Sequence, residues 1–144
     1  INIQMVINMK VNGKNLNKHG KGVEINSKGV VTVGNFEYGF LQGYGERIWP
    51  DGAIYKGNFK DGFMYGKGTW RKGMAESANI YEGEFANDMK NGKGIFKWGI
   101  SGNIYKGEFF NDQRHGFVTY IWKDGVKYVG NWDSNKQHGK GIWK

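Results

Sequence analysis

Apolar and polar residues alternate along most of the chain, in short segments that glycine interrupts at regular places. In Tyr55-Lys56-Gly57-Asn58-Phe59, the two aromatic residues and the glycine fall on one face, and the polar residues fall on the other. Because side chains alternate across a strand with a period of two, this pattern predicts a β-strand with one apolar face. The segment Gly66-Lys67-Gly68-Thr69-Trp70 predicts a second strand. Each such pair of segments is expected to form a β-hairpin.

This two-segment unit recurs along the sequence with a nearly constant period. The glycine near the start of each second segment recurs at Gly20, Gly43, Gly66, Gly92, Gly116 and Gly139. The period is about 23 residues, a length typical of repeat proteins whose units fold only against their neighbours. The longest step, 26 residues from Gly66 to Gly92, predicts a longer loop within Arg71–Asn79.

Turn signals separate the units. They are Pro50-Asp51-Gly52, Lys72-Gly73, Ser101-Gly102 and Asp124-Gly125. An Asp-Gly pair between alternating segments favours a two-residue hairpin turn, in which both central residues have positive φ. We therefore expect tight turns to join consecutive hairpins into one continuous antiparallel meander.

The predicted fold is all-β: an elongated, single-layer, twisted antiparallel β-meander built from successive hairpins, with an open sheet. Residues Ile1–Val11 alternate loosely and predict an edge strand. Residues 1–31 are interpreted as this strand followed by a diverged capping repeat, which is typical of the end of a repeat array. Residues 32–144 are divided into five repeats, at 32–54, 55–80, 81–104, 105–127 and 128–144.

Glycine and aromatic residues are both abundant, with 25 glycines and 16% aromatic residues. A single-layer sheet has no second layer to cover its apolar face. Large rings are therefore expected to lie across bare glycine positions of neighbouring strands, each burying on the order of 150–250 Å². On this interpretation, Gly57→Val displaces the ring that covers Gly57 and damages two adjacent units.

The unit Tyr-x-Gly-x-(Phe/Trp), followed by Gly and then by His-Gly-x-Gly, resembles the MORN repeat (membrane occupation and recognition nexus). The resemblance covers Thr32–Lys144, with a diverged unit at Val11–Val31. The chain departs from the repeat pattern at Thr32 in place of tyrosine, at Val118 in place of glycine, and at Asp88, Asp112 and Asn135 in place of a mid-loop glycine. The resemblance implies an elongated, curved sheet with an aromatic-lined groove.

The resemblance also implies a role. Members of the family mostly act as scaffolds or adaptors. Some belong to cytoskeletal and ciliary assemblies such as radial spokes, some lie at membrane junctions, and some are appended to lipid kinases or methyltransferases.

Amino-acid composition and net charge restrict the kinds of site and partner that this chain can have. The absence of cysteine excludes disulfides and thiolate metal sites, and favours a reducing compartment. No apolar run approaches the roughly 20 residues of a membrane span. The net charge of +8 makes an anionic partner such as phospholipid plausible. Because 18 of the 21 basic residues are lysine, and no nucleic-acid motif occurs, nucleic-acid binding is not expected.

No catalytic or metal site is predicted, and no cofactor or small-molecule substrate is expected. His19, His115 and His138 share one repeat position, which holds Gln42, Tyr65 and Asn91 in other units, and successive copies are at least a repeat apart. Glu82, Glu84 and Glu108 are expected to pair across strands with Lys56, Lys93, Lys97 and Lys106 on a solvated face. Gly66-Lys67-Gly68 lacks the strand–loop–helix context of a phosphate loop.

Two surfaces are candidates for binding. An aromatic groove for a protein partner is predicted from Trp49, Trp70, Phe96, Trp98, Tyr120, Trp122 and Trp143 of second strands and from Tyr55, Tyr81, Tyr105 and Tyr128 of first strands. A lysine row for anionic lipid is predicted from Lys21, Lys67, Lys93 and Lys140. Ile48, Ile95, Ile121 and Ile142 add apolar spots on the opposite face.

The favoured hypothesis is a non-enzymatic scaffold or adaptor that presents the aromatic groove to a protein within a multi-subunit assembly. The expected location is cytoplasmic, on the cytoskeleton or in a cilium, or at the inner face of a membrane. Two alternatives remain open. One is a module that binds anionic phospholipid or phosphoinositide. The other is the accessory region of a larger enzyme, since the sequence begins without methionine and stops within a repeat.

Overall fold

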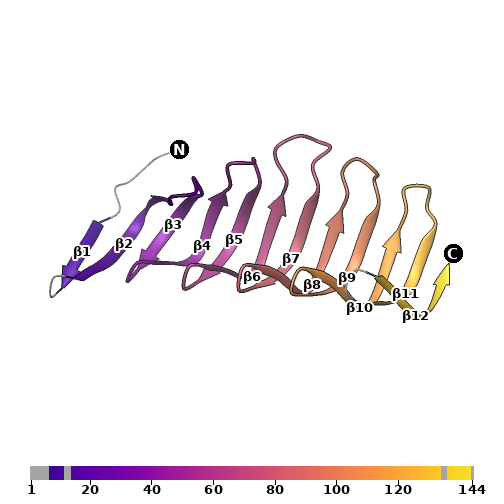
Figure 1. The fold of residues 1–144 in the computed structure, drawn as a ribbon. Helices are drawn as coiled ribbons and strands as arrows, with labels where there is room; N and C mark the ends of the chain where they lie inside the picture. Colours follow the sequence, from indigo (N-terminus) through magenta and orange to yellow (C-terminus); the bar gives the residue numbers. More distant parts are fainter. Residues whose placement is uncertain (1–6, 12–13, 134–135, 144) are drawn as a thin grey trace.

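The computed structural model describes residues 7–11, 14–133 and 136–143, and the side chains of residues 19–131. The described residues form twelve strands in one antiparallel sheet whose strand order follows the chain order (Figure 1). The all-β, single-layer meander predicted from the sequence is therefore confirmed. The expected edge strand is observed over Ile7–Val11, and residues 1–6 of that prediction lie outside the described residues.

Each repeat supplies two strands. In chain order the strands are β1 (Ile7–Val11), β2 (Lys14–Ile25), β3 (Val31–Glu37), β4 (Phe40–Ile48), β5 (Ile54–Lys60), β6 (Phe63–Arg71), β7 (Ile80–Ala86), β8 (Met89–Lys97), β9 (Ile104–Phe110), β10 (Gln113–Ile121), β11 (Lys127–Asp133) and β12 (Lys136–Trp143). The longer loop predicted before the third hairpin is confirmed, since β6 ends at Arg71 and β7 begins at Ile80.

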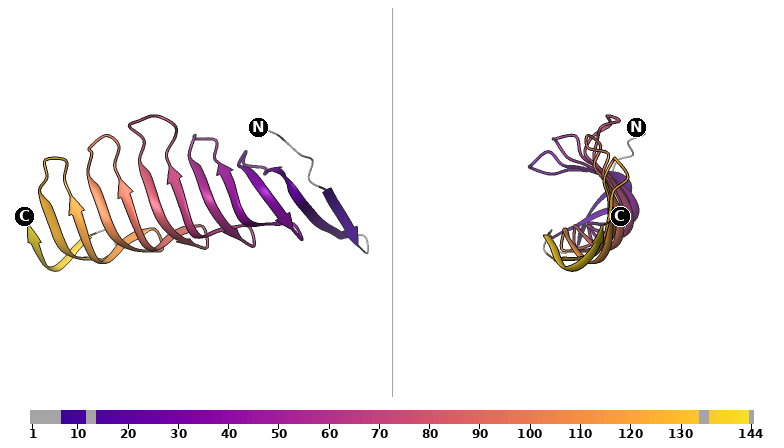
Figure 2. Two further views of the ribbon diagram at one scale, coloured as in Figure 1. Left: turned by 180° about the vertical axis from the view of Figure 1, so that it is seen from behind. Right: turned by 90° about the vertical axis from the view of Figure 1, so that its right-hand side faces the viewer.

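The strands are bent, so the sheet is C-shaped in cross-section when viewed along its length (Figure 2). In the second hairpin, Gly57 pairs with Gly68, but Phe59 pairs with Met64, so β6 carries two extra residues between these pairs. Gly66 lies in this bulge with φ of 70°, a conformation that favours glycine. Because bulges of this kind bend a strand, their recurrence along the array gives the sheet a concave face and an outer face.

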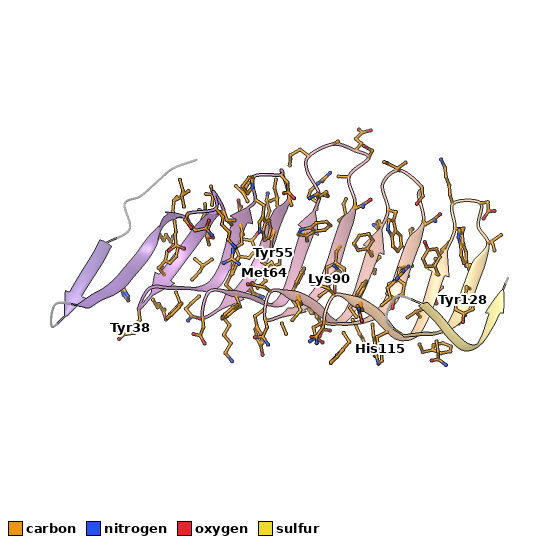
Figure 3. All side chains as sticks on the ribbon, viewed as in Figure 1. Tyr38, Tyr55, Met64, Lys90, His115 and Tyr128 are labelled. Atoms are coloured by element: carbon orange, nitrogen blue, oxygen red, sulfur yellow. The ribbon has the colours of Figure 1, made fainter. Side chains whose placement is uncertain are left out.

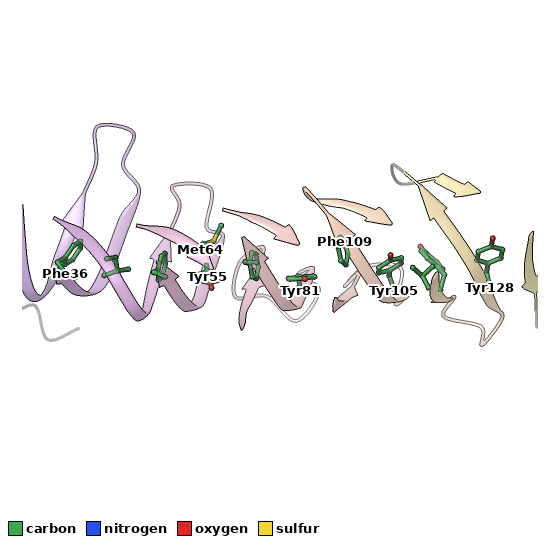
Figure 4. Packing of buried hydrophobic residues seen from close by; sticks show 12 residues of the cluster. Phe36, Tyr55, Met64, Tyr81, Tyr105, Phe109 and Tyr128 are labelled. Carbon is green, nitrogen blue, oxygen red and sulfur yellow. The ribbon is translucent and has the colours of Figure 1, made fainter. Parts of the chain in front are cut away.

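The core is a row of buried hydrophobic side chains along the sheet (Figure 4). It lies on the concave face, where tyrosine rings cover glycines. Tyr55 is 0% exposed, and a Cβ atom added to Gly68 would lie 2.4 Å from its ring and hydroxyl, which is too close for van der Waals contact. The Tyr55 hydroxyl donates to the Asn58 carbonyl oxygen at 2.8 Å. The equivalent bond from Tyr81 reaches the Glu84 carbonyl oxygen at 2.8 Å. The predicted packing of rings over glycine is confirmed.

Edge-to-face contacts link each repeat to the next. The Tyr55 ring centroid lies 5.1 Å from that of Phe59 in its own strand and 4.9 Å from that of Phe85 in the following hairpin. Tyr81 repeats this arrangement with Phe85 at 5.0 Å and Phe109 at 5.1 Å. The core is therefore a continuous column, and each unit depends on its neighbours for burial.

The turns between hairpins differ from the prediction. Gly52 has φ of 93° but Asp51 does not have positive φ, so the Asp-Gly pair does not form the expected two-residue turn. Instead the Gly52 N–H donates to the Trp49 carbonyl oxygen at 2.9 Å, and the Trp49 N–H donates to the Ala53 carbonyl oxygen at 3.0 Å. Three residues lie within this loop, so a single left-handed glycine closes it.

The turns with two positive φ values lie at the other end of each hairpin, here called the hairpin tip. Only two residues separate β5 from β6, and Asp61 and Gly62 have φ of 51° and 83°. Asn87 and Asp88 follow the same rule at the next tip, with φ of 50° and 67°. A two-residue loop needs this conformation to match the strand twist.

Candidate functional site: the concave aromatic face

Above the buried tyrosines, a line of aromatic rings follows the concave face, here called the ring ladder. Its members are Trp70, Phe96, Trp98, Tyr120 and Trp122. Neighbouring centroids are 6.4 Å apart for Trp70 and Phe96, and 4.6 Å apart for Phe96 and Trp98. The line continues from Trp98 to Tyr120 at 5.3 Å and from Tyr120 to Trp122 at 4.5 Å. Apart from Tyr120, which is 9% exposed, these rings are half-buried.

Backbone hydrogen bonds fix the tryptophans at the hairpin ends. Trp98 and Trp122 are the first residues after β8 and β10. The Trp98 N–H donates to the Asn103 carbonyl oxygen at 3.0 Å, and the Trp98 carbonyl accepts from the Gly102 N–H at 2.9 Å. Trp122 makes the same pair of bonds with Val126 and Gly125, both at 2.9 Å. The two indoles are therefore held by closed turns rather than by mobile loop ends.

Two cations, Lys90 and Arg114, reach the ring ladder from the hairpin tips, and Lys90 is labelled in Figure 3. The Lys90 Nζ lies 5.7–5.9 Å from the ring centroids of Trp70, Tyr81, Phe96 and Phe109. It also lies 3.4 Å from Asp112 Oδ1. The Arg114 Cζ lies 5.6 Å from the Trp98 ring, and burial lowers the pKa of Arg114. Cations at these distances from aromatic faces are attracted by the ring quadrupole.

Arg47 crosses the concave face at the N-terminal end of the ring ladder. It occupies the position that Trp70 holds in the next repeat, and its Cζ lies 5.0 Å from the Phe59 ring. One guanidinium nitrogen donates to the Gly62 carbonyl oxygen at 2.7 Å, and another lies 3.2 Å from Asp88 Oδ1. Because these partners lie at hairpin tips, Arg47 ties the two rims of the concave face together, and the open part of the ring ladder begins at Trp70.

The predicted groove residues separate into two groups. Tyr55, Tyr81, Tyr105 and Tyr128 are at most 3% exposed, so they belong to the core and offer no side-chain surface to a partner. Burial raises the pKa of Tyr55, Tyr81 and Tyr105, which keeps their hydroxyls protonated as hydrogen-bond donors. Trp49, Trp70, Phe96, Trp98 and Trp122 keep partial exposure. The side chain of Trp143 lies outside the described part of the chain.

A large hollow lies on the outer face, opposite the ring ladder. This outer trough has a volume of about 1360 Å³ and runs over the glycine positions between Tyr44 and Phe117. Its charged lining residues are Lys56, Lys67, Arg71, Glu82, Glu84, Lys93, Lys106 and Glu108.

The structure divides the lysine row that was predicted from the sequence. Lys67 and Lys93 line the trough, but Lys21 lines a separate hollow of about 450 Å³. Tyr44 takes the equivalent position on β4, so the row is interrupted. The side chain of Lys140 is not described. The expected Glu–Lys pairing is also corrected: Lys67 stands opposite Glu84 and Lys93 opposite Glu108 in register, yet these four side chains form no ion pair.

A family comparison identifies the repeats. The model of the MORN repeat matches residues 33–54, 55–74, 81–102, 105–127 and 128–144. The chain belongs to the MORN repeat family. No curated protein matches it. MORN repeats are generally interaction modules for proteins or membranes, and the family is generally non-catalytic. The resemblance to the MORN repeat is confirmed. The predicted bounds of the repeats and the interpretation of residues 1–31 as a capping repeat stay predictions.

Within the described part of this MORN array, no group of three histidine, cysteine, aspartate or glutamate side chains could hold a metal ion. His19 and His115 lie on different hairpins, each with its ring centroid 6.0 Å from an aromatic neighbour, Tyr38 and Phe110 respectively. The side chain of His138 is not described. Among the described residues, no helix has the length and apolarity needed to cross a bilayer.

The cations on the concave face of the MORN array were not predicted as site residues. Leu41, Met64, Lys90 and Arg114 share the second position of β4, β6, β8 and β10. Comparison of these positions could have found Lys90 and Arg114, because the first two repeats place apolar, buried side chains there. A basic residue that replaces a core residue in later repeats indicates a polar contact on the core face.

Proposed function

We propose that this MORN array is a non-catalytic interaction module that binds a protein partner along the ring ladder. The observation that supports the proposal is the continuity of partly exposed rings from Trp70 to Trp122 above a core with almost no exposed surface. Tryptophan and tyrosine dominate the energetics of protein interfaces because they bury large apolar areas at low entropic cost.

The length of the ring ladder suits a short segment of the partner. Trp70 ends β6 and Trp122 follows β10, so the ladder spans four strand spacings, or about 19 Å. This corresponds to roughly 13 residues of an α-helix. Apolar side chains on one face of such a segment would contact the indoles of Trp98 and Trp122.

We further propose that the module serves as a scaffold or adaptor in a cytoplasmic assembly of the cytoskeleton or cilium. Its support is the MORN family alone. Attachment to anionic phospholipid is the second candidate function, and the observation that favours it is the exposure of Lys56, Lys67, Lys93 and Lys106 on the outer face of a chain with net charge +8.

The test is a pull-down from cytoplasmic extract followed by titration of the purified partner. Trp98→Ala and Trp122→Ala are expected to weaken the affinity by at least about tenfold each. Phe63→Ala is the matched control, because Phe63 is an exposed aromatic residue that belongs to neither the core cluster nor the ring ladder. Circular dichroism and thermal unfolding establish that the tryptophan variants remain folded. An unchanged affinity of both folded tryptophan variants would contradict the proposal.

A further inference from the structure

The outer trough has the dimensions of a binding site for an extended polypeptide chain. Its ends are marked by Tyr44 on β4 and Phe117 on β10, which are 65% and 68% exposed. These residues are six strand spacings apart, so the trough is about 29 Å long. Both rings are available at the surface rather than used in the core.

The width of the outer trough favours an extended chain over a helix. On each strand the central glycine is flanked by two side chains of the same face, such as Lys56 and Asn58 beside Gly57, or Glu82 and Glu84 beside Gly83. Side chains two residues apart on a strand are about 6.6 Å apart. A helix with side chains is about 10–12 Å wide, so it would not fit between these two rows.

The floor of the outer trough allows a chain to approach closely. Gly57, Gly68, Gly83, Gly94 and Gly107 line it. These glycines expose only backbone atoms, whereas the charged side chains belong to the residues next to them along each strand and line the two sides of the trough. A segment that runs along the array, across the strands, can thus lie against the sheet and contact charges from successive strands.

The charges of the outer trough favour an acidic occupant. Five basic and three acidic side chains line it, which leaves an excess of two positive charges. Lys67 on β6 and Lys93 on β8 are exposed and two strand spacings apart, about 9.6 Å. One turn of a polyproline II segment, three residues, advances about 9.3 Å. Carboxylates three residues apart would therefore meet Lys67 and Lys93 in turn.

We propose that the outer trough binds an extended acidic segment of a protein partner, about ten residues long. Carboxylates three residues apart contact Lys67 and Lys93, and apolar side chains at the two ends contact Tyr44 and Phe117. Glu84 and Glu108 disfavour a segment that is acidic at every position, because each faces the space beside one of these lysines. This surface is separate from the ring ladder and does not depend on the function proposed for it.

The test is fluorescence anisotropy with the whole chain and a labelled peptide as the probe. The peptide has ten residues, with phenylalanine at both ends, glutamate at its fourth and seventh positions, and glycine and serine elsewhere. The expected result is saturable binding, at least about tenfold tighter than that of the same peptide with lysine at both glutamate positions. The double variant Lys67→Glu/Lys93→Glu is expected to weaken binding of the glutamate peptide by at least about tenfold.

Lys97→Glu/Lys127→Glu is the matched control. It changes the net charge equally at exposed positions that do not line the trough, and it is expected to change the affinity less than about twofold. Trp98→Ala is also expected to leave peptide binding unchanged, which separates this site from the ring ladder. Three results would overturn the proposal. The first is no binding of the peptide at about 1 mM, and the second is an equal weakening of peptide binding by both double variants. The third is that the wild-type chain binds phosphatidylserine vesicles but not the peptide, and that Lys67→Glu/Lys93→Glu abolishes the vesicle binding.

Discussion

Asp88 and Met64 exchange two hydrogen bonds between successive hairpin tips. The Met64 N–H donates to Asp88 Oδ1 at 2.7 Å, and the Asp88 N–H donates to the Met64 carbonyl oxygen at 3.3 Å. Asp112 and Lys90 repeat the exchange one hairpin later, at 2.7 Å and 2.9 Å. Gly62 holds the equivalent place at the tip of the preceding hairpin, and because it has no side chain it makes only the backbone member of this pair, from its N–H to the Leu41 carbonyl oxygen at 3.0 Å. Aspartate at the tip therefore adds a side-chain connection between repeats.

Replacement of Asp88 by glycine is expected to lower the free energy of unfolding by about 1–3 kcal/mol. The variant keeps a residue that tolerates the φ of 67° at this position, but the Met64 N–H loses its side-chain acceptor and Arg47 loses its carboxylate partner. Urea unfolding followed by circular dichroism measures the change. Asn87→Gly at the same tip, with φ of 50°, is the control. Equal losses in the two variants would show that the carboxylate contributes nothing.

Gly68→Ala is expected to destabilise the array by about 1–3 kcal/mol through overpacking. The three closest atoms to the added methyl group all belong to the Tyr55 side chain, and they are two ring carbons and the hydroxyl oxygen. Gly57→Ala is expected to cost more, because its methyl group would lie 2.5 Å from the Gly68 Cα and 2.8 Å from the Lys67 carbonyl oxygen, and backbone moves less easily than a side chain.

A double-mutant cycle distinguishes these two glycines. In a Tyr55→Leu background the cost of Gly68→Ala is expected to fall by at least about 1 kcal/mol, whereas that of Gly57→Ala is expected to persist. Thermal and urea unfolding of all four variants and their backgrounds provide the measurement. Additive behaviour at Gly68 would mean that the Tyr55 ring is not what excludes a side chain there.

The strands and the core could be predicted because their signals are local and repeated. The alternation around Gly57 and its recurrence define the strand faces, and the rings of Tyr55 and Tyr81 can reach only the glycines of their own and adjacent strands. The turn between hairpins was assigned the wrong type because Asp51-Gly52 also suits a longer loop with one left-handed residue. The spacing of residues in the sequence does not indicate that a backbone hydrogen bond between Trp49 and Ala53 closes this loop.

The binding surfaces were less predictable because they depend on the curvature of the sheet. Lys90 and Trp70 lie near opposite ends of their strands, and the bend brings the Lys90 amino group to 5.9 Å from the Trp70 ring. Before the bend is known, Lys90 has the appearance of an ordinary surface lysine. Similarly, the register places Lys67 opposite Glu84, but only the structure reveals that they form no ion pair and line a hollow instead.

Lys90→Met is expected to change the free energy of unfolding by less than about 1 kcal/mol. The flexible apolar side chain restores the residue type found at Met64, and replacement of a partly buried ion pair by an apolar group is often neutral. Lys90→Glu is expected to cost about 3–5 kcal/mol, because a carboxylate would face four ring faces and Asp112. Urea unfolding of the two variants at neutral pH provides the comparison. A similar stability of both would exclude a role for charge at this position.

Stability is expected to fall steeply in alkaline solution. Burial raises the pKa of Tyr55, Tyr81 and Tyr105 above the usual value of about 10 that applies in the unfolded chain. Above that pH the unfolded chain releases tyrosine protons that the folded chain retains, so protonation favours the folded state below pH 10 and this advantage is lost as the pH rises. Each tyrosine contributes a loss of up to about 1.4 kcal/mol per pH unit.

Urea unfolding measured at intervals between about pH 8 and pH 11.5 tests this linkage, because the free energy of unfolding should be nearly constant below pH 10 and then decline. Tyr81→Phe keeps the ring but removes the titrating hydroxyl, which donates to the Glu84 carbonyl oxygen at 2.8 Å. This variant is expected to be less stable at pH 8 by about 1 kcal/mol, yet to lose stability more slowly at high pH. A wild-type profile that stays flat to pH 11.5, or a Tyr81→Phe slope equal to that of the wild type, would mean that these hydroxyls ionise as readily in the folded sheet as in the unfolded chain.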